Sequence, residues 1–246
     1  MSNRRLFALL VGIDKYQPPI PALDGCVHDM RAMHDYLQRY TTIKGIDFYP
    51  LTLVNQEATR FNLVEKFEDH LGQASDNDVA LFYYSGHGSQ EHAHEIFWEI
   101  ESDQKNETLV CYDSRLPDGM DLADKELATL LDIVAQFNPH IVSIIDSCIS
   151  GKITRSTKEY TKTRQVDAVP SLSDMHTPRI RMPQSYILPR STFTERALGL
   201  ESDPEELLIP NPRHVALSAS RSFQLAKETY LGGMPRGVFT YSLIEV

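Results

Sequence analysis

The sequence predicts an α/β fold in which helices cover both faces of a mainly parallel sheet. Apolar segments of strand length alternate with segments of helical periodicity, which is typical of βαβ units. Two of the apolar segments, Val79–Tyr84 and Ile141–Ile145, are continuous runs, as in strands buried on both faces. With 246 residues, the chain is long enough for one large α/β domain or two small ones, with a core that needs no disulfides.

The first half of the chain supplies three of the expected strands. A strand at Leu6–Ile13 is an apolar run far too short to cross a bilayer. A helix from Gly25 to about Tyr40 follows, with apolar residues at helical spacing. The next elements are a strand at Tyr49–Val54, a helix that carries Leu63, Phe67 and Leu71, and the strand that leads to His87.

The second half is less regular. Glu91–Asp121 shows a mixed pattern of apolar and polar residues and suggests a short hairpin. A helix is then expected that contains Leu127 to Phe137 and ends before Pro139. After the Ile141–Ile145 strand, regular structure is expected again only at a strand over His214–Ser218 and a helix from Gly237 to Val246.

Each of the two buried strands is followed by a reactive side chain. Val79–Tyr84 runs into Ser85-Gly86-His87-Gly88, and Ile141–Ile145 runs into Asp146-Ser147-Cys148. Parallel sheets place functional groups beyond the carboxyl ends of their strands, so neighbouring strands would bring His87 and Cys148 together. A thiol beside an imidazole is a nucleophile with its base. Taken singly, Cys148 could be a small buried apolar residue and His87 a strand-end histidine bonded to a carbonyl.

The residues around this pair suggest further roles. Strand alternation puts Ser85 on the side of His87, and Asp146 on the side of Cys148. The backbone N–H groups of Gly88 and Cys148 are candidate oxyanion donors, and one such donor contributes ~3–4 kcal/mol to acyl transfer.

Composition excludes several classes of function. The formal net charge of −10 argues against binding to nucleic acid or an anionic membrane, and it would suit a basic substrate. The three cysteines, Cys26, Cys111 and Cys148, are widely spaced and suggest neither a disulfide framework nor a zinc ribbon. A reducing, cytoplasmic compartment is therefore expected.

The residues at 84–90 (YSGHGSQ) and 146–151 (DSCISG) resemble the two catalytic signatures of the caspase-like cysteine peptidases of clan CD and type C14. The sequence is most similar to the metacaspase and prokaryotic orthocaspase branch. The resemblance continues at 8–13 with Tyr16, at 23–29, at 107–110, at Gln224-x-Ala226-x-Glu228 and at 237–241. One departure is Ile149, where the family usually has His after Cys. The implied fold is the caspase-hemoglobinase three-layer α/β/α sandwich.

The resemblance also implies roles for individual residues. His87 would be the general base and acid, and Cys148 the nucleophile that forms a thioester. The subsite for the residue before the cut would be built from Cys26, Asp29, Ser85 and Asp146. Independently, carboxylates at this edge should favour a guanidinium or ammonium group, so cleavage is predicted after Arg, then Lys. Purely structural roles stay open: Asp29 could serve the helix dipole, and Asp146 could accept a backbone hydrogen bond.

The chain is interpreted as one caspase-like domain over 1–246. Residues 1–151 would form the part similar to a large subunit, 152–212 a basic, proline-rich intersubunit loop, and 213–246 the start of a truncated part similar to a small subunit. Within 152–212 lie seven of the fourteen prolines. The loop is expected to be an activation segment that self-cleavage or another protease cuts, or a pseudosubstrate; a solvated loop is the alternative. Its candidate cleavage sites are Lys152, Arg155, Lys158, Lys162, Arg164, Arg179, Arg181 and Arg190.

No metal or other cofactor is expected, and the alternative that stays open is calcium dependence, which the resemblance implies because many metacaspases need calcium. The histidines and cysteines show no paired zinc spacing. The acidic residues show no calcium-loop pattern, and Arg155 stands where calcium-dependent relatives tend to place an acid. Expected partners are protein substrates with a basic residue before the cut, and an upstream activating protease or regulator. The protein itself is expected to be a monomer.

Three functions remain for such a chain. The first is an arginine-directed cysteine endopeptidase, for which the resemblance permits a role in stress responses, programmed cell death or antiphage (antiviral) defence. The second is a catalytically silent caspase-like interaction module. A ligase or transpeptidase is the third, because it would share the thioester and differ only in the nucleophile that resolves it.

Overall fold

A computed structural model of the chain describes residues 3–99, 101–148, 161–167, 180–187, 214–220 and 226–245. The predicted sites Lys152, Arg155, Lys158, Arg179 and Arg190 lie outside these ranges, as does Ile149. Within the described residues, no helix combines the length and the apolar character needed to cross a membrane.

A parallel sheet of five strands forms the centre, in the spatial order β2-β1-β3-β7-β9. The strands are β1 (Arg5–Gly12), β2 (Asp47–Val54), β3 (Val79–Ser85), β7 (His140–Asp146) and β9 (His214–Ser218). Every residue of β3 is buried, as its uninterrupted apolar sequence predicts. Because β3 and β7 are neighbours and pair Ser85 with Asp146, their carboxyl ends coincide.

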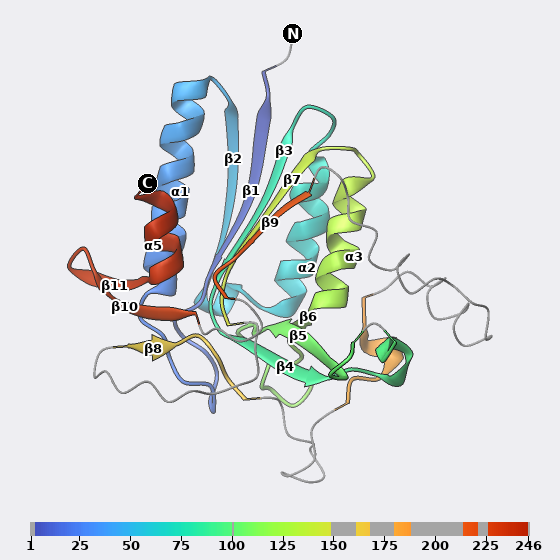
Figure 1. The fold of residues 1–246 in the computed structure, drawn as a ribbon. Coiled ribbons are helices and arrows are strands. Elements are labelled where there is room, and N and C mark those ends of the chain that lie inside the picture. The colour runs from blue at the N-terminus through green and yellow to red at the C-terminus, as the bar shows by residue number, and fades with distance from the viewer. Residues whose placement is uncertain are drawn as a thin grey trace.

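Helices cover both faces of this sheet, so the predicted three-layer α/β/α architecture is confirmed (Figure 1). On one face, α1 (Cys26–Lys44) and α5 (Val238–Ile244) pack on Leu6, Ala8, Leu10, Leu81 and Tyr83. On the other, α2 (Arg60–Asp69) and α3 (Asp124–Ala135) pack on Phe7, Leu9, Val11, Phe82 and Tyr84. The alternation of side chains along β1 and β3 thus separates two cores.

The predicted helices and strands are found, with shifted ends. The first helix extends to Lys44, where Gly45 closes it in a left-handed conformation with φ of 65°. Leu71 lies in the 3₁₀ turn η2 (Leu71–Gln73) after α2, and Phe137 lies beyond the end of α3. Further single 3₁₀ turns are η1 (Asn55–Glu57), η3 (Glu95–Phe97) and η4 (Pro183–Ser185).

Two small antiparallel sheets lie beyond the carboxyl ends of the central strands (Figure 1). One consists of β4 (Gly88–His92), β5 (Lys105–Leu109) and β6 (Leu122–Ala123), where a hairpin was expected. The other consists of β8 (Lys162–Thr163), β10 (Lys227–Leu231) and β11 (Met234–Gly237).

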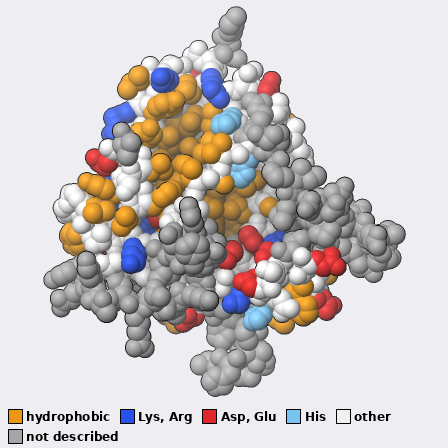
Figure 2. Space-filling view, in the orientation of Figure 1, with side chains coloured by type: hydrophobic (Ala, Val, Ile, Leu, Met, Phe, Trp, Pro, Cys, Tyr) orange, Lys and Arg blue, Asp and Glu red, His pale blue; other side chains and the backbone are white. Residues whose placement is uncertain are grey.

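The second small sheet corrects one expectation. The segment after Cys148 was expected to be an irregular connection throughout, but β8 pairs with β10, and Arg164 and Arg181 are fully buried. These two arginines therefore belong to the packed structure. Figure 2 also shows apolar side chains gathered on the face that carries α1, α5 and β9, where Val215, Leu217 and Val238 are exposed.

Candidate active site

The carboxyl edge of β3 and β7 brings His87 and Cys148 to one place. His87 follows Ser85 by two residues, and Cys148 follows Asp146 by two residues. A Cβ atom on Gly88 would collide with the carbonyl group of Cys148, so the two turns are in contact. This close approach explains why glycine follows the histidine.

The His87 ring is held by a backbone carbonyl. Its Nε2 lies 2.8 Å from the carbonyl oxygen of Pro21. Because a carbonyl only accepts, Nε2 carries the proton, and Nδ1 keeps the free lone pair. Nδ1 is buried and has no hydrogen-bond partner among the described residues. The backbone N–H of His87 donates to Tyr16 Oη at 2.8 Å.

The Cys148 thiol is buried against the chain just before β10. The backbone N–H of Ala226 donates to Sγ at 3.1 Å, and Sγ lies 3.4 Å from the carbonyl oxygen of Ala226. Burial raises the pKa of Cys148 to about 11. Burial also lowers the pKa of His87 to about 4, and the positive charge of Arg164 acts in the same direction. At neutral pH the pair therefore consists of a thiol and a neutral imidazole.

A peptide carbonyl of the same chain is held by the backbone at Cys148 and at the residue after His87. The carbonyl oxygen of Arg164 accepts the backbone N–H of Gly88 at 2.9 Å and that of Cys148 at 3.2 Å. These are the two donors that the sequence suggested for an oxyanion. An oxygen held by two such donors is where negative charge develops when the neighbouring carbon is attacked.

The guanidinium of Arg164 fills a pocket behind this carbonyl. Nη1 lies 2.9 Å from Ser85 Oγ and 2.9 Å from Asp146 Oδ2, and Nη2 lies 2.6 Å from Asp29 Oδ2. The Arg164, Asp29 and Asp146 side chains are all 0% exposed. The structure thus brings together three of the four predicted pocket residues around one cation.

The fourth predicted residue, Cys26, lies beside the pocket with a carboxylate that was not predicted. Cys26 Sγ is 3.9 Å from Glu228 Oε2, which in turn is 3.4 Å from Arg164 Nη2. Glu228 also accepts the backbone N–H groups of Asp24 and Gly25, so it fixes the loop before α1. The sequence carried a signal for Glu228, because it belongs to the quoted Gln224-x-Ala226-x-Glu228 pattern.

Fixed contacts hold the pocket in shape. Asp14 accepts the backbone N–H groups of Cys26 and Val27 and so takes the place of a helix cap for α1. Asp29, in the first turn of α1, pairs with Arg236 Nε at 2.8 Å. Burial raises the pKa of Asp29, and Arg164 offsets part of that effect. Buried carboxylates of this kind require a cationic partner.

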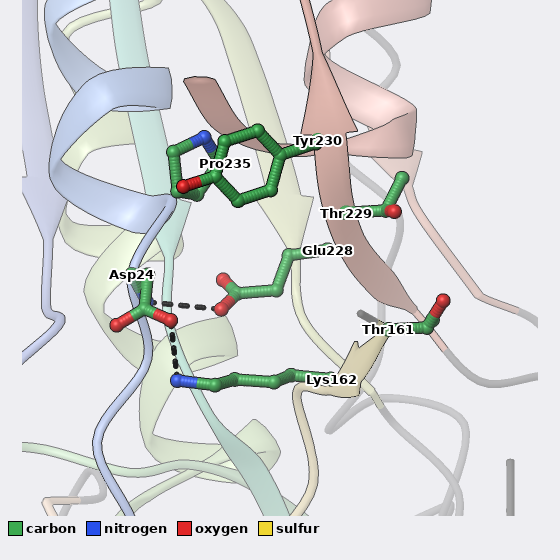
Figure 3. Close-up of a pocket in the computed structure, with 7 residues that line it drawn as sticks. All are labelled: Asp24, Thr161, Lys162, Glu228, Thr229, Tyr230 and Pro235. Carbon is green, nitrogen blue, oxygen red and sulfur yellow. Dashed lines mark hydrogen bonds and ion pairs between the residues drawn. The ribbon is translucent and has the colours of Figure 1, made fainter. Parts of the chain in front are cut away.

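The two residues before Arg164 form strand β8, which pairs with β10 at the edge of the second small sheet. In β8, Lys162 pairs with Glu228 and Thr163 with Lys227, and the backbone N–H of Arg164 donates to Ala226 O at 3.1 Å. Lys162 and Glu228 line a cavity of about 160 Å³ together with Asp24, Thr161, Thr229, Tyr230 and Pro235 (Figure 3). There Lys162 Nζ lies 2.5 Å from Asp24 Oδ2 (Figure 3).

The described residues contain no group of three or more His, Cys, Asp and Glu side chains arranged for a metal ion. Sequence reasoning missed Pro21 because a backbone carbonyl leaves no residue signature. It also missed β10, because Lys227–Leu231 (KETYL) contains no apolar run.

The chain matches a known family over most of its length. Residues 7–156 match the model of the metacaspase, peptidase C14 domain. Metacaspase-1 of Candida glabrata is 24% identical over 100% of this chain and 65% of its own length. Metacaspase-1B of Neurospora crassa is 31% identical over 61% of this chain and 34% of its own length. Metacaspase-1 of Schizosaccharomyces pombe is 24% identical over 97% of this chain and 59% of its own length. The chain thus spans about a third to two thirds of these curated relatives.

A solved structure supports the fold. Protein GSU0716 from Geobacter sulfurreducens superimposes with a TM-score of 0.59 and 21% identity, over 98% of this chain and 81% of that protein. At this level of identity the similarity concerns the arrangement of helices and strands.

Proposed function

Because this chain belongs to the metacaspase family of C14 peptidases, we propose that it is a cysteine endopeptidase that cuts polypeptides after arginine. One observation carries the proposal. Arg164 places its guanidinium among Asp29, Ser85 and Asp146, while its carbonyl oxygen accepts hydrogen bonds from Gly88 and Cys148. A substrate requires both contacts at once, one for selection and one for reaction.

The chemistry follows from the neutral pair. Cys148 Sγ attacks the carbonyl carbon as its proton passes to His87 Nδ1, and the oxygen takes up negative charge against the two N–H donors. Collapse of this intermediate breaks the C–N bond, and His87 returns the proton to the leaving amine. Water, deprotonated by His87, then hydrolyses the thioester and regenerates the thiol.

The pocket favours arginine over lysine for a geometric reason. The guanidinium uses Nη1 for Ser85 and Asp146 and uses Nη2 for Asp29 and Glu228, so two nitrogens share these contacts. A lysine ammonium is a single point charge on one nitrogen, so it cannot reproduce contacts that are divided between two nitrogens. An aspartate in this position would add a negative charge to three buried carboxylates, so it is rejected.

The same contacts support self-cleavage between Arg164 and Gln165. Among the eight predicted cleavage sites, Lys162, Arg164 and Arg181 lie in the described residues, and only Arg164 of these three combines the pocket with the two N–H donors. Until the bond is cut, Arg164 blocks the pocket as a pseudosubstrate, so the uncut chain is a zymogen. Cleavage frees the new C-terminus at Arg164 to leave the pocket.

Fluorogenic peptides that end in Arg, Lys, Asp or citrulline test the substrate class. The reduced, self-cleaved protein is expected to release fluorophore from the Arg peptide fastest, then from Lys, and not from Asp, with Cys148→Ala as the inactive control. Absence of turnover with every peptide would favour the silent interaction module. Product analysis with an added amine nucleophile separates hydrolysis from transpeptidation.

A further inference from the structure

A second arginine of the loop, Arg181, is buried in a separate acidic pocket. Its Nη1 lies 2.6 Å from Glu126 Oε2, and its Nε lies 2.8 Å from Glu91 Oε1. Nη2 donates to the carbonyl oxygen of Asp121 at 2.6 Å and to Glu91 Oε2 at 3.2 Å. The guanidinium carbon is also 5.1 Å from the centre of the Tyr186 ring. The two Nη atoms thus donate hydrogen bonds to oxygens of the pocket, whereas Nε meets Glu91 as an ion-pair contact without a hydrogen bond.

The pocket is formed by the folded core of the protein. Glu91 comes from β4 and Glu126 from the first turn of α3, and the Glu91 and Glu126 side chains are 7% and 0% exposed. Glu126 has a second cationic partner, Arg60, but among the described residues Arg181 is the only cation that the Glu91 carboxylate pairs with. Burial raises the pKa of Glu91, and Arg181 offsets part of that effect. Removing the arginine would leave a buried carboxylate with Asn106 as its remaining partner.

Two described segments, which flank residues 168–179 in the sequence, contact the two ends of one strand. Gly88, the first residue of β4, forms a parallel bridge with Gln165, and His92, the last residue of β4, forms one with Ile180. Ser89 Oγ donates to the carbonyl oxygens of Val166 and Asp167, at 2.9 and 3.1 Å. An edge strand that pairs with a second polypeptide segment is a common mode of peptide recognition. Figure 1 shows residues 180–187 beside the far end of β4.

We propose that β4 and the Glu91–Glu126 pocket form a binding site for the polypeptide that follows the cleaved bond, with the pocket selecting an arginine. In the uncut chain, Arg181 of the loop, seventeen residues after Arg164, occupies it. After self-cleavage and displacement of this segment, the same site takes an arginine downstream of the cut in a protein substrate. The proposal rests on the proposed function, and it adds a preference that short peptides ending at the cut cannot report.

Long peptides test this site. The parent peptide carries residues 158–190 of the chain, a second carries Arg181→Gln, and a matched control carries Arg179→Gln, which removes the same charge two residues away. The enzyme used in this assay carries Arg181→Gln, so that its own loop competes only weakly with the added peptide for the Glu91–Glu126 pocket. Mass spectrometry follows the cut after Arg164, and each kcat/KM is divided by that enzyme's value for a short Arg peptide.

The parent and Arg179→Gln peptides are expected to be cut about tenfold more efficiently than the Arg181→Gln peptide, because a buried charge pair loses one partner. An enzyme that also carries Glu91→Gln should lose this preference. Equal values for all three peptides would overturn the proposal, although cleavage itself would continue.

A binding measurement tests the downstream site even if the protein has no peptidase activity. If even the short Arg peptide is not cut, the proposed function fails, and the downstream site is then tested without catalysis. Fluorescence anisotropy measures labelled 158–190 peptides on the Cys148→Ala, Arg164→Gln, Arg181→Gln protein. A Kd about tenfold lower for the parent than for the Arg181→Gln peptide supports the site, and equal Kd values overturn it.

Discussion

Neutralising one carboxylate of the arginine pocket should reduce turnover of arginine substrates. Asp146 Oδ2 lies 2.9 Å from Arg164 Nη1, and both side chains are 0% exposed. Truncating one partner of such a buried charge pair costs about 2–5 kcal/mol. In Asp146→Asn, the Asp29 and Glu228 carboxylates and the amide oxygen remain, so the low end applies. A loss of about 2 kcal/mol corresponds to about a 30-fold lower kcat/KM for an Arg peptide.

A citrulline peptide distinguishes lost charge from damaged structure. Citrulline has nearly the shape of arginine without its charge, so its turnover by Asp146→Asn should stay at the wild-type value. The control Asp35→Asn makes the same change of net charge at an exposed position outside the pocket. A kcat/KM for the Arg peptide within twofold of wild type, or an equal loss for Arg and citrulline, would refute the charge argument.

Three further outcomes are expected. Gly88→Ala would push a methyl group into the Cys148 carbonyl and should lower kcat more than about 100-fold. Gly72→Ala has room for its methyl group and should leave kcat unchanged, so an equal kcat for the two variants would contradict the contact between Gly88 and Cys148. Tyr16→Phe leaves the buried backbone N–H of His87 without its acceptor and should lower the free energy of unfolding, measured in urea, by about 1–3 kcal/mol. An unchanged free energy of unfolding would contradict this and show that water replaces the hydroxyl. The self-cleavage rate should stay constant from about pH 5.5 to 9 and fall only as His87 gains a proton near its pKa of about 4. The reason is that a protonated imidazole cannot accept the thiol proton. A steep rise in the rate up to pH 9 would instead indicate that the reaction requires the Cys148 thiolate.

The central sheet could be predicted because its strands carry strong local signals. The continuous apolar run Val79–Tyr84 predicted an inner strand, and β3 is buried along its whole length. Strand ends also predicted the neighbourhood of His87 and Cys148, because parallel strands deliver their next residues to one edge.

The contacts around Arg164 could not be predicted, because pairing over long sequence distances defines them. The two residues of β8 form a strand only because β10 lies beside them, and Lys162 meets Glu228 across more than sixty residues of chain. For the same reason, the basic residues alone could not distinguish Arg164 from Lys162 and Arg181, the other two candidates that the structure describes: that distinction comes from backbone pairing with Ala226, Gly88 and Cys148.

Intact-mass analysis of the freshly purified protein during incubation tests the central claim most directly. Two fragments separated between Arg164 and Gln165 are expected from the wild type, none from Cys148→Ala, and none at this bond from Arg164→Gln. Persistent full-length wild type that nevertheless turns over Arg peptides, or cleavage at other bonds with Arg164–Gln165 left intact, would contradict the assignment of Arg164 as the residue presented for reaction.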